Sequence, residues 1–261
     1  MRGTEVARVV AMVAASPIIT AMPVRLEPDY VLLNVADGVV LDEAAPCADS
    51  PGLVGIFLTH AHIGHYTGLM YLGRESMNSK DVKVYAMPRM KQMLEQNAPW
   101  SQLVGLKNIS LQPLVDKSEV RLNDRLTIEP FLVPHRDEFS ETVGYRIRSR
   151  SKTLIFIPDI DKWHLWGKNI VEEIKKVDIA FLDATFYDNT EVNNRNIAEI
   201  PHPFVVESLE LFKNLPEKEK SKIHFLHFNH TNPLLDPEST QTKDLLIKGF
   251  KIAKMGDTFK L

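Results

Sequence analysis

Three histidines lie within six positions of the chain, in the stretch IFLTHAHIGHYTGL at residues 56–69. They are His60, His62 and His65, and Gly64 stands directly before the last of them. The whole chain of 261 residues has nine histidines, so this density indicates a shared task. Neutral imidazole nitrogen binds zinc at about 2.0–2.1 Å, and His60 and His62, two residues apart in an extended turn, can both reach one ion. His65 is expected to point toward a second position.

Four further strand-like segments end in a residue that can bind a metal ion. FLVPH ends at His135, FIPD at Asp159, AFLD at Asp183 and HFLH at His227. In open α/β sheets, ligands gather at the carboxyl ends of the strands because the loops converge there. The sequence therefore predicts a common rim that carries several metal ligands.

The late histidine has two competitors. His224 alternates with Phe225 and is expected to face solvent, and His230 stands in the turn-like segment NHTNP. Position at a strand end favours His227. A metal ion held with one coordination place open lowers the pKa of a bound water from 15.7 to about 7, which makes hydroxide available at neutral pH.

Alternating strands and helices are needed to bring these residues together. Apolar runs predict strands at 53–59, 82–87, 126–135, 142–149, 153–159, 178–186 and 222–228. Apolar residues at helical spacing predict helices at 66–79, 88–100, 166–177 and 203–215. A strand pair is expected at 29–40, turned at Asp37-Gly38. The alternation predicts an α/β fold, with residues 1–261 as a single domain.

Composition limits the other functions. Lys+Arg 31 against Asp+Glu 34 gives a net charge of −3, which predicts no clear nucleic-acid surface. A single cysteine, Cys47, excludes an intrachain disulfide and an all-cysteine zinc site. The opening MRGTEVARVVAMVAASPIITAMPV is typical either of a buried element or of a secretory signal, so a cytoplasmic location is expected, with export as the alternative. No uninterrupted apolar run elsewhere approaches the roughly 20 residues of a spanning helix.

THAHIGH resembles the His-x-His-x-Asp-His signature of the metallo-β-lactamase superfamily, and the later order of His, Asp and His matches as well. The resemblance covers about residues 53 to 235. Within that superfamily, THAHIGHYTGL, DATF and HFNHTNP look most like coenzyme PQQ synthesis protein B, and they are similar to ribonuclease Z and the small phosphodiesterases. The resemblance implies a four-layer αβ/βα sandwich with the metal site at one edge of two packed sheets.

The resemblance also implies roles for individual residues. The first metal site would be formed by His60, His62 and His135, and the second by His65, Asp159 and His227, with Asp159 bridging the two. LDATF resembles the EATF segment of ribonuclease Z, in which an acidic residue pairs with a later histidine. Here that catalytic pair would be Asp183 and His202, which would move a proton to a leaving group.

The chain departs from the family in two places. The signature aspartate falls on Gly64, so the second metal site is expected to be weak, empty or completed by another group such as Asp183. Residues 1–25 do not resemble the usual opening strand, so the N-terminal part is expected to be shortened or rebuilt. A strand missing there would leave an exposed edge that favours a homodimer.

These observations predict a metal-dependent hydrolase in which metal-bound hydroxide attacks an ester, phosphodiester or amide of a small-molecule substrate. The expected cofactor is Zn²⁺, one or two ions, with Fe²⁺ or Mn²⁺ as alternatives. A single-iron oxidase or hydroxylase in cofactor synthesis is the first alternative, because histidine plus carboxylate sites suit non-haem Fe(II). A non-catalytic binding protein with the same fold is the second.

Overall fold

Two seven-stranded sheets form the centre of the computed structural model, which describes residues 8–10, 22–25, 30–33, 53–192, 195–254 and 257–261. The first sheet has the order β14-β1-β2-β3-β4-β5-β6, and the second β13-β12-β11-β10-β9-β8-β7. The strands of the first sheet are β1 (Arg8–Val10), β2 (Met22–Arg25), β3 (Tyr30–Leu33), β4 (Leu53–Phe57), β5 (Val82–Ala86), β6 (Ile109–Pro113) and β14 (Thr258–Lys260). Those of the second are β7 (Val120–Arg121), β8 (Thr127–Leu132), β9 (Val143–Arg148), β10 (Thr153–Ile157), β11 (Ile179–Asp183), β12 (Ile223–Leu226) and β13 (Lys251–Ile252).

Both faces of β10, β11 and β12 are covered, which explains why these strands read as nearly continuous apolar runs. In β10, Leu154 and Phe156 point into the core between the sheets, whereas Ile155 and Ile157 point outward to a second core beneath helices. This alternation follows from the two-residue period of a strand. Each fully buried large side chain contributes about 1.5–3 kcal/mol. The result is the four-layer αβ/βα sandwich that the sequence predicted.

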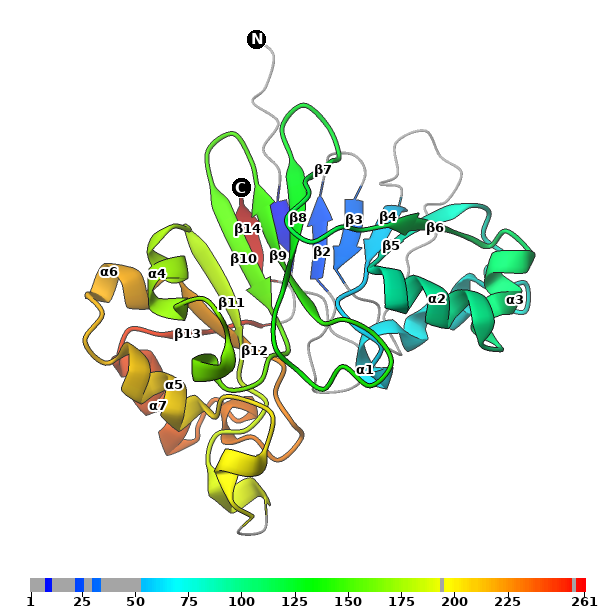
Figure 1. Ribbon diagram of the computed structural model, residues 1–261. Coiled ribbons are helices and arrows are strands. Elements are labelled where there is room, and N and C mark those ends of the chain that lie inside the picture. The colour runs from blue at the N-terminus through cyan, green and yellow to red at the C-terminus, as the bar shows by residue number, and fades with distance from the viewer. Residues whose placement is uncertain (1–7, 11–21, 26–29, 34–52, 193–194, 255–256) are drawn as a thin grey trace.

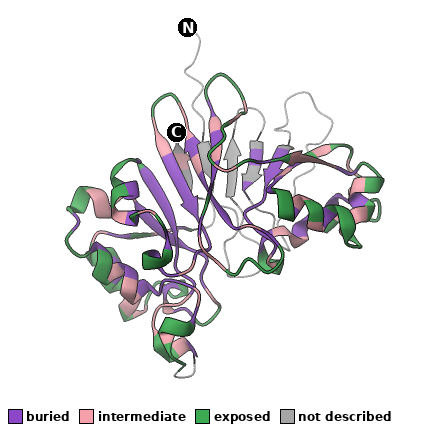
Figure 2. Cartoon of the chain, in the orientation of Figure 1, coloured by how far each residue is buried: buried purple, intermediate pink, exposed green. Residues whose placement is uncertain are grey.

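Helices form the two outer layers (Figure 1). On the first sheet lie α2 (Pro88–Gln96) and α3 (Trp100–Gly105), and on the second lie α4 (Ile170–Lys175), α5 (Val205–Phe212) and α7 (Thr240–Ile247). A short α6 (Glu217–Lys220) stands within the charged segment after α5. Figure 2 shows the buried residues concentrated along the strands and the exposed ones on the outward faces of the helices.

Several predicted elements differ from the observed ones. The helix predicted at 66–79 is instead a single turn, α1 (Ile63–Tyr66), followed by a 3₁₀ helix, η1 (Thr67–Leu72). In η1 the buried Leu69 and Leu72 are three residues apart, the period of a 3₁₀ helix, and the helix ends at Gly73. Strand β6 was not predicted, because ISLQP contains too few apolar residues to stand out.

The N-terminal segment contains more of the first sheet than the sequence indicated. Strands β1 and β2 both fall within residues 1–25, which were expected to be shortened or rebuilt, and they pair antiparallel with each other. The predicted strand at 29–40 is confirmed for Tyr30–Leu33, which pairs with β2 and β4. The predicted turn at Asp37-Gly38 lies outside the described residues, as does Cys47.

Strand direction places the candidate ligands at one edge. β10, β11 and β12 run parallel, and β9 runs antiparallel to both β8 and β10. The carboxyl ends of β8, β10, β11 and β12 therefore lie at the same edge of the second sheet. α1, which follows β4 of the first sheet, lies at this same end of the molecule (Figure 1). Among the described residues, no helix is long and apolar enough to cross a membrane.

Candidate metal centre

The ends of β4, β8, β10, β11 and β12 and the segments that follow them bring all eight predicted site residues into one largely buried cluster. Asp159 lies at its centre. One carboxylate oxygen of Asp159, Oδ2, lies 3.2 Å from His60 Nε2 and 3.4 Å from His65 Nε2. The other, Oδ1, lies 3.2 Å from both His135 Nε2 and His202 Nδ1. This central position is the one that a bridging carboxylate requires.

The first predicted ligand group is compact. His60 Nε2 and His62 Nδ1 are 2.9 Å apart, and one ligand atom from each of His60, His62, His135 and Asp159 lies within 4.8 Å of the others. The far nitrogen of His60, Nδ1, lies 2.9 Å from the hydroxyl of Thr59. That contact turns Nε2 of His60 toward the cluster, as a hydrogen bond on the far nitrogen does for metal-binding histidines.

The second predicted ligand group also converges. His65 Nε2 lies 3.2 Å from His227 Nε2, and His227 Nε2 lies 3.9 Å from Asp159 Oδ2. His227 has a backbone φ of 67°, a left-handed conformation that is uncommon for a residue other than glycine. Such backbone strain is found preferentially at functional sites.

These residues fit a divalent metal ion. Ligands that bind zinc tetrahedrally at 2.0–2.1 Å lie about 3.4 Å from one another, close to the contacts in the cluster. His135 Nδ1 is buried and has no hydrogen-bond partner among the described residues, and His135 Nε2 and Asp159 Oδ1 face each other at 3.2 Å without the geometry of a hydrogen bond. Buried polar atoms without a partner are rare, and a bound ion would supply one.

Burial keeps three of the histidines in the neutral form that binds a metal ion. Burial lowers the pKa of His60 well below its usual value, lowers that of His62, and lowers that of His65 to about 4. All three are therefore neutral at pH 7, the state in which imidazole binds a metal. The His62 side chain is 20% exposed, against 1% for His60 and 3% for His65, so the cluster opens to solvent beside His62.

The pKa values of Asp159 and His202 are shifted in opposite directions. Burial alone would raise the pKa of Asp159, but the charges of His202 and His227 outweigh it and hold that pKa well below its usual value. Burial alone would lower the pKa of His202, but the carboxylates of Asp183 and Asp159 raise it above its usual value. His202 is therefore suited to carry a proton.

Asp183 and His202 form the pair that the sequence predicted. His202 Nδ1 donates to Asp183 Oδ2 at 2.9 Å. The same oxygen accepts from the backbone of Ile160, and Oδ1 accepts from both the backbone and the hydroxyl of Thr185. A carboxylate offers about four lone-pair sites, so Asp183 has none left for an ion.

A second geometric group complicates the assignment. Asp159, Asp183, His202 and His227 also have ligand atoms within 4.8 Å of one another. The saturated hydrogen bonding of Asp183 argues against that group as an ion site. The same saturation argues against Asp183 as the replacement for the carboxylate missing at Gly64.

Glu138 was missed by the sequence analysis. Its Oε2 lies 3.0 Å from His62 Nε2, on the loop between β8 and β9. This loop is fastened to the histidine turn by Ala61, whose backbone N–H donates to Ser140 Oγ at 2.8 Å. Arg89 of α2 donates to the backbone carbonyl of Asp137 at 2.9 Å. A charged residue in a polar loop gives no periodic signal, so only the fold could identify Glu138.

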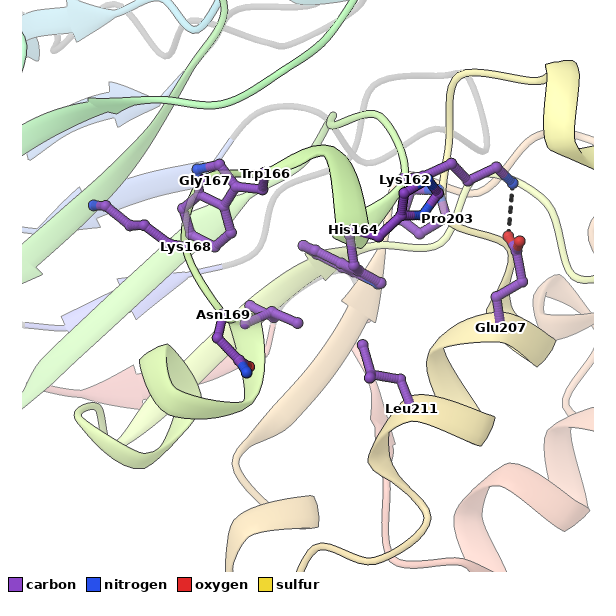
Figure 3. Close-up of a pocket in the computed structure, with 11 residues that line it drawn as sticks. Lys162, His164, Trp166, Gly167, Lys168, Asn169, Pro203, Glu207 and Leu211 are labelled. Atoms are coloured by element: carbon purple, nitrogen blue, oxygen red, sulfur yellow. Dashed lines mark hydrogen bonds and ion pairs between the residues drawn. The ribbon is translucent and has the colours of Figure 1, made fainter.

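The other histidines lie apart from the cluster. His224 is buried rather than facing solvent, because its ring packs between Phe181 and Phe259 at 5.3 and 4.8 Å. His230 is exposed. His164 is exposed and lines a pocket of about 510 Å³ between α4 and α5 (Figure 3). None of the eight candidate residues lines that pocket.

The fold agrees with the comparisons. The sequence profile of the beta-lactamase superfamily domain matches residues 32–225, and the chain belongs to this superfamily. Coenzyme PQQ synthesis protein B of Gluconobacter oxydans is 28% identical over 126 residues, which cover 46% of this chain and 40% of that protein. Alignments with other proteins of that name reach 72% and 82% of their length.

Solved structures share the fold. The Zn²⁺-bound PqqB of Methylobacterium extorquens superposes with a TM-score of 0.76 at 18% identity, over 97% of this chain and 100% of that one. A diphosphatase of the PhnP family superposes with a TM-score of 0.64 at 19% identity, over 92% of this chain and 83% of that one. The superfamily thus includes hydrolases.

Proposed function

We propose that the protein is a metal-dependent hydrolase that acts on an ester, phosphodiester or amide bond of a small molecule. The observation that carries this proposal is the convergence of five histidines and Asp159 beside a separate Asp183–His202 pair. Hydrolysis at neutral pH needs both a source of nucleophile and a proton donor. The cluster and the adjacent pair supply candidates for each.

His60, His62 and His135 would hold the first ion together with Asp159, and His65 and His227 would share Asp159 for a second. When bound, a divalent cation lowers the pKa of a coordinated water and neutralises developing negative charge. The second group has one donor fewer than the first, because Gly64 has no side chain. Zinc is the proposed ion, held more tightly at the first group than at the second.

His202 would deliver a proton to the leaving group. Its Nδ1 donates to Asp183, which leaves Nε2 to exchange a proton with a substrate. The His202 side chain is 11% exposed, so a substrate atom can approach it, whereas the Asp183 side chain is fully buried. Asp183 therefore orients His202 and holds it in one tautomer.

One observation favours the alternative of a single-iron oxidase or hydroxylase. The first group alone offers three histidines and a carboxylate, a donor set that also suits non-haem Fe(II). The weaker second group is compatible with a centre that holds one ion. Metal content and oxygen consumption separate the two proposals.

Two substitutions test the proposed function. His62→Ala should lose metal and activity together, because it removes a candidate ligand. His202→Ala should keep its metal and slow the cleavage of an activated phosphodiester or ester by roughly 10²–10⁴-fold. Circular dichroism confirms that both variants fold, and elemental analysis after dialysis gives their metal content.

The outcomes separate the proposals. Loss of metal from His202→Ala would make His202 a ligand and end the proposed pair. Oxygen uptake that depends on Fe(II), without hydrolysis by the zinc-loaded protein, would favour the oxidase. Full metal content with neither activity on a broad substrate panel would favour a binding protein.

A further inference from the structure

The hydroxyl of Thr185 lies between the candidate metal ligand His227 and the Asp183–His202 pair. Thr185 Oγ1 is 2.6 Å from Asp183 Oδ1, 2.7 Å from His227 Nδ1 and 3.1 Å from His202 Nδ1. The residue is 8% exposed, so water does not compete freely for these contacts. It is the second residue after β11 and belongs to the DATF segment.

The proton of this hydroxyl can be placed by counting donors. An ionised carboxylate only accepts, so Thr185 must donate its single proton to Asp183. The contact with His227 therefore needs a proton on Nδ1 of that histidine. A neutral His227 protonated at Nδ1 has its lone pair on Nε2, the atom 3.2 Å from His65 Nε2.

We propose that Thr185 is a positioning residue that fixes His227 in the Nδ1-protonated tautomer and joins this ligand to the Asp183–His202 pair. This inference rests on the proposed function, because it assigns His227 to an ion. Hydrogen bonds on the far nitrogen of a metal-binding histidine set its tautomer and orientation. Among the described residues, Thr185 Oγ1 lies 2.7 Å from His227 Nδ1, whereas Asp183 Oδ1 lies 3.6 Å from it, beyond hydrogen-bond distance.

The backbone holds Thr185 in place independently of its hydroxyl. Ala184 N donates to the carbonyl of Leu226 at 2.9 Å, and Asn229 N donates to the carbonyl of Thr185 at 2.8 Å. Asn232 Nδ2 donates to the carbonyl of Ala184 at 2.7 Å. Replacement of the hydroxyl by a methyl group should therefore change the hydrogen bonds and leave the chain path intact.

The test compares Thr185→Val, which keeps the shape, with Thr185→Ser, which keeps the hydroxyl. Thr242→Val is the matched control, because Thr242 is also a buried threonine whose hydroxyl bonds, but it bonds to the carbonyl of Pro233 in a distant turn. The zinc dissociation constants are measured by competition with a chelator. The tautomer of His227 is read from its ¹⁵N chemical shifts in the metal-free protein.

Thr185→Val should raise the dissociation constant of the second zinc ion, the one assigned to His65 and His227, by about 10–100-fold. This is the usual effect of losing a hydrogen-bond partner of a metal-binding histidine. It should also replace the Nδ1-protonated signal of His227 with a mixture of tautomers. Thr185→Ser should restore both, and Thr242→Val should change neither.

Two results would overturn the proposal. One is a wild-type His227 that is protonated at Nε2 when metal-free, a result that does not need a folded variant. The other is a Thr185→Val protein whose zinc affinity matches that of Thr242→Val. Failure of the wild type to bind any metal would end the proposed function, whereas the tautomer measurement would still decide the role of Thr185.

Discussion

Restoration of a carboxylate at Gly64 is the sharpest test of how the two ion groups differ. Gly64 is the second residue of α1, and a Cβ atom built on it meets no atom within 4 Å. The backbone φ of Gly64 lies outside the left-handed region. Among the described glycines, only Gly249 has a φ in that region. An aspartate can therefore enter without backbone strain or a clash at Cβ.

Gly64→Asp is expected to change the free energy of unfolding less than it changes the free energy of zinc binding. Removal of a glycine from a helix contributes a few tenths of a kcal/mol, and an acidic residue in the first turn contributes about 0.3–1 kcal/mol more. Since α1 has four residues, the change in the free energy of unfolding should stay below about 1 kcal/mol. An added charged donor at the second group should strengthen zinc binding there at least tenfold, which corresponds to about 1.4 kcal/mol.

The assay is a zinc titration against a chelator, with metal content measured after dialysis. Gly64→Ala controls for helix stability, and Gly64→Asn supplies a side chain of the same shape without the charge. Gly64→Asp should retain close to two ions per chain, whereas the wild type and Gly64→Ala should retain closer to one. If all three variants bind the second ion with equal affinity, position 64 does not face the second group. The missing carboxylate would then not be the reason that the second group binds zinc weakly.

Three further changes test the neighbouring residues. Asp183→Asn should slow turnover less than His202→Ala does and leave metal content unchanged, as measured by steady-state rates beside elemental analysis. Glu138→Gln should weaken zinc binding by about 10–100-fold through misorientation of His62, and Glu141→Gln on the same loop is its control. Burial, and then the charge of Lys251, lower the pKa of His224 to about 4, so the unfolded chain binds the extra proton as pH falls from about 6.5. The stability due to neutral His224 is complete above about pH 6.5 and is lost toward pH 4. Urea unfolding should therefore show that the free energy of unfolding falls by about 2 kcal/mol less in His224→Leu than in the wild type between about pH 7 and 4.5. An unchanged decline in that variant would show that His224 does not cause it.

The sequence predicted the architecture where local pattern and global packing agree. Strands such as 153–159 are apolar on both faces, so their burial between two layers could be inferred without a structure. The prediction of a helix at 66–79 was wrong, because apolar spacing alone does not distinguish an α-helix from a 3₁₀ helix near glycines. Strands β1 and β2 were not identified because they have three and four residues, too few to give a clear alternating pattern, and β1 also pairs with β14 at the far end of the chain.

The candidate site shows the same division. Histidines and aspartates at strand ends could be identified because strand ends meet at one edge, and the structure brings them together. His224 was expected to face solvent, since alternation shows which face a side chain is on and not whether that face is covered. Glu138 and the hydroxyl of Thr185 act through contacts across 76 and 42 residues of sequence, which no local pattern encodes.

The cluster also has consequences for stability. His135 Nδ1 is buried with no hydrogen-bond partner among the described residues, and the 3.2 Å contact between His135 Nε2 and Asp159 Oδ1 lacks hydrogen-bond geometry. A buried polar group that lacks its partner costs about 1–3 kcal/mol, so the metal-free protein bears a penalty of about that size at this edge of the sheets. An ion that binds the folded chain and not the unfolded one offsets that penalty by mass action. The proposed ion would satisfy the atoms whose burial weakens the metal-free fold, so stability and ion binding at this centre should rise and fall together.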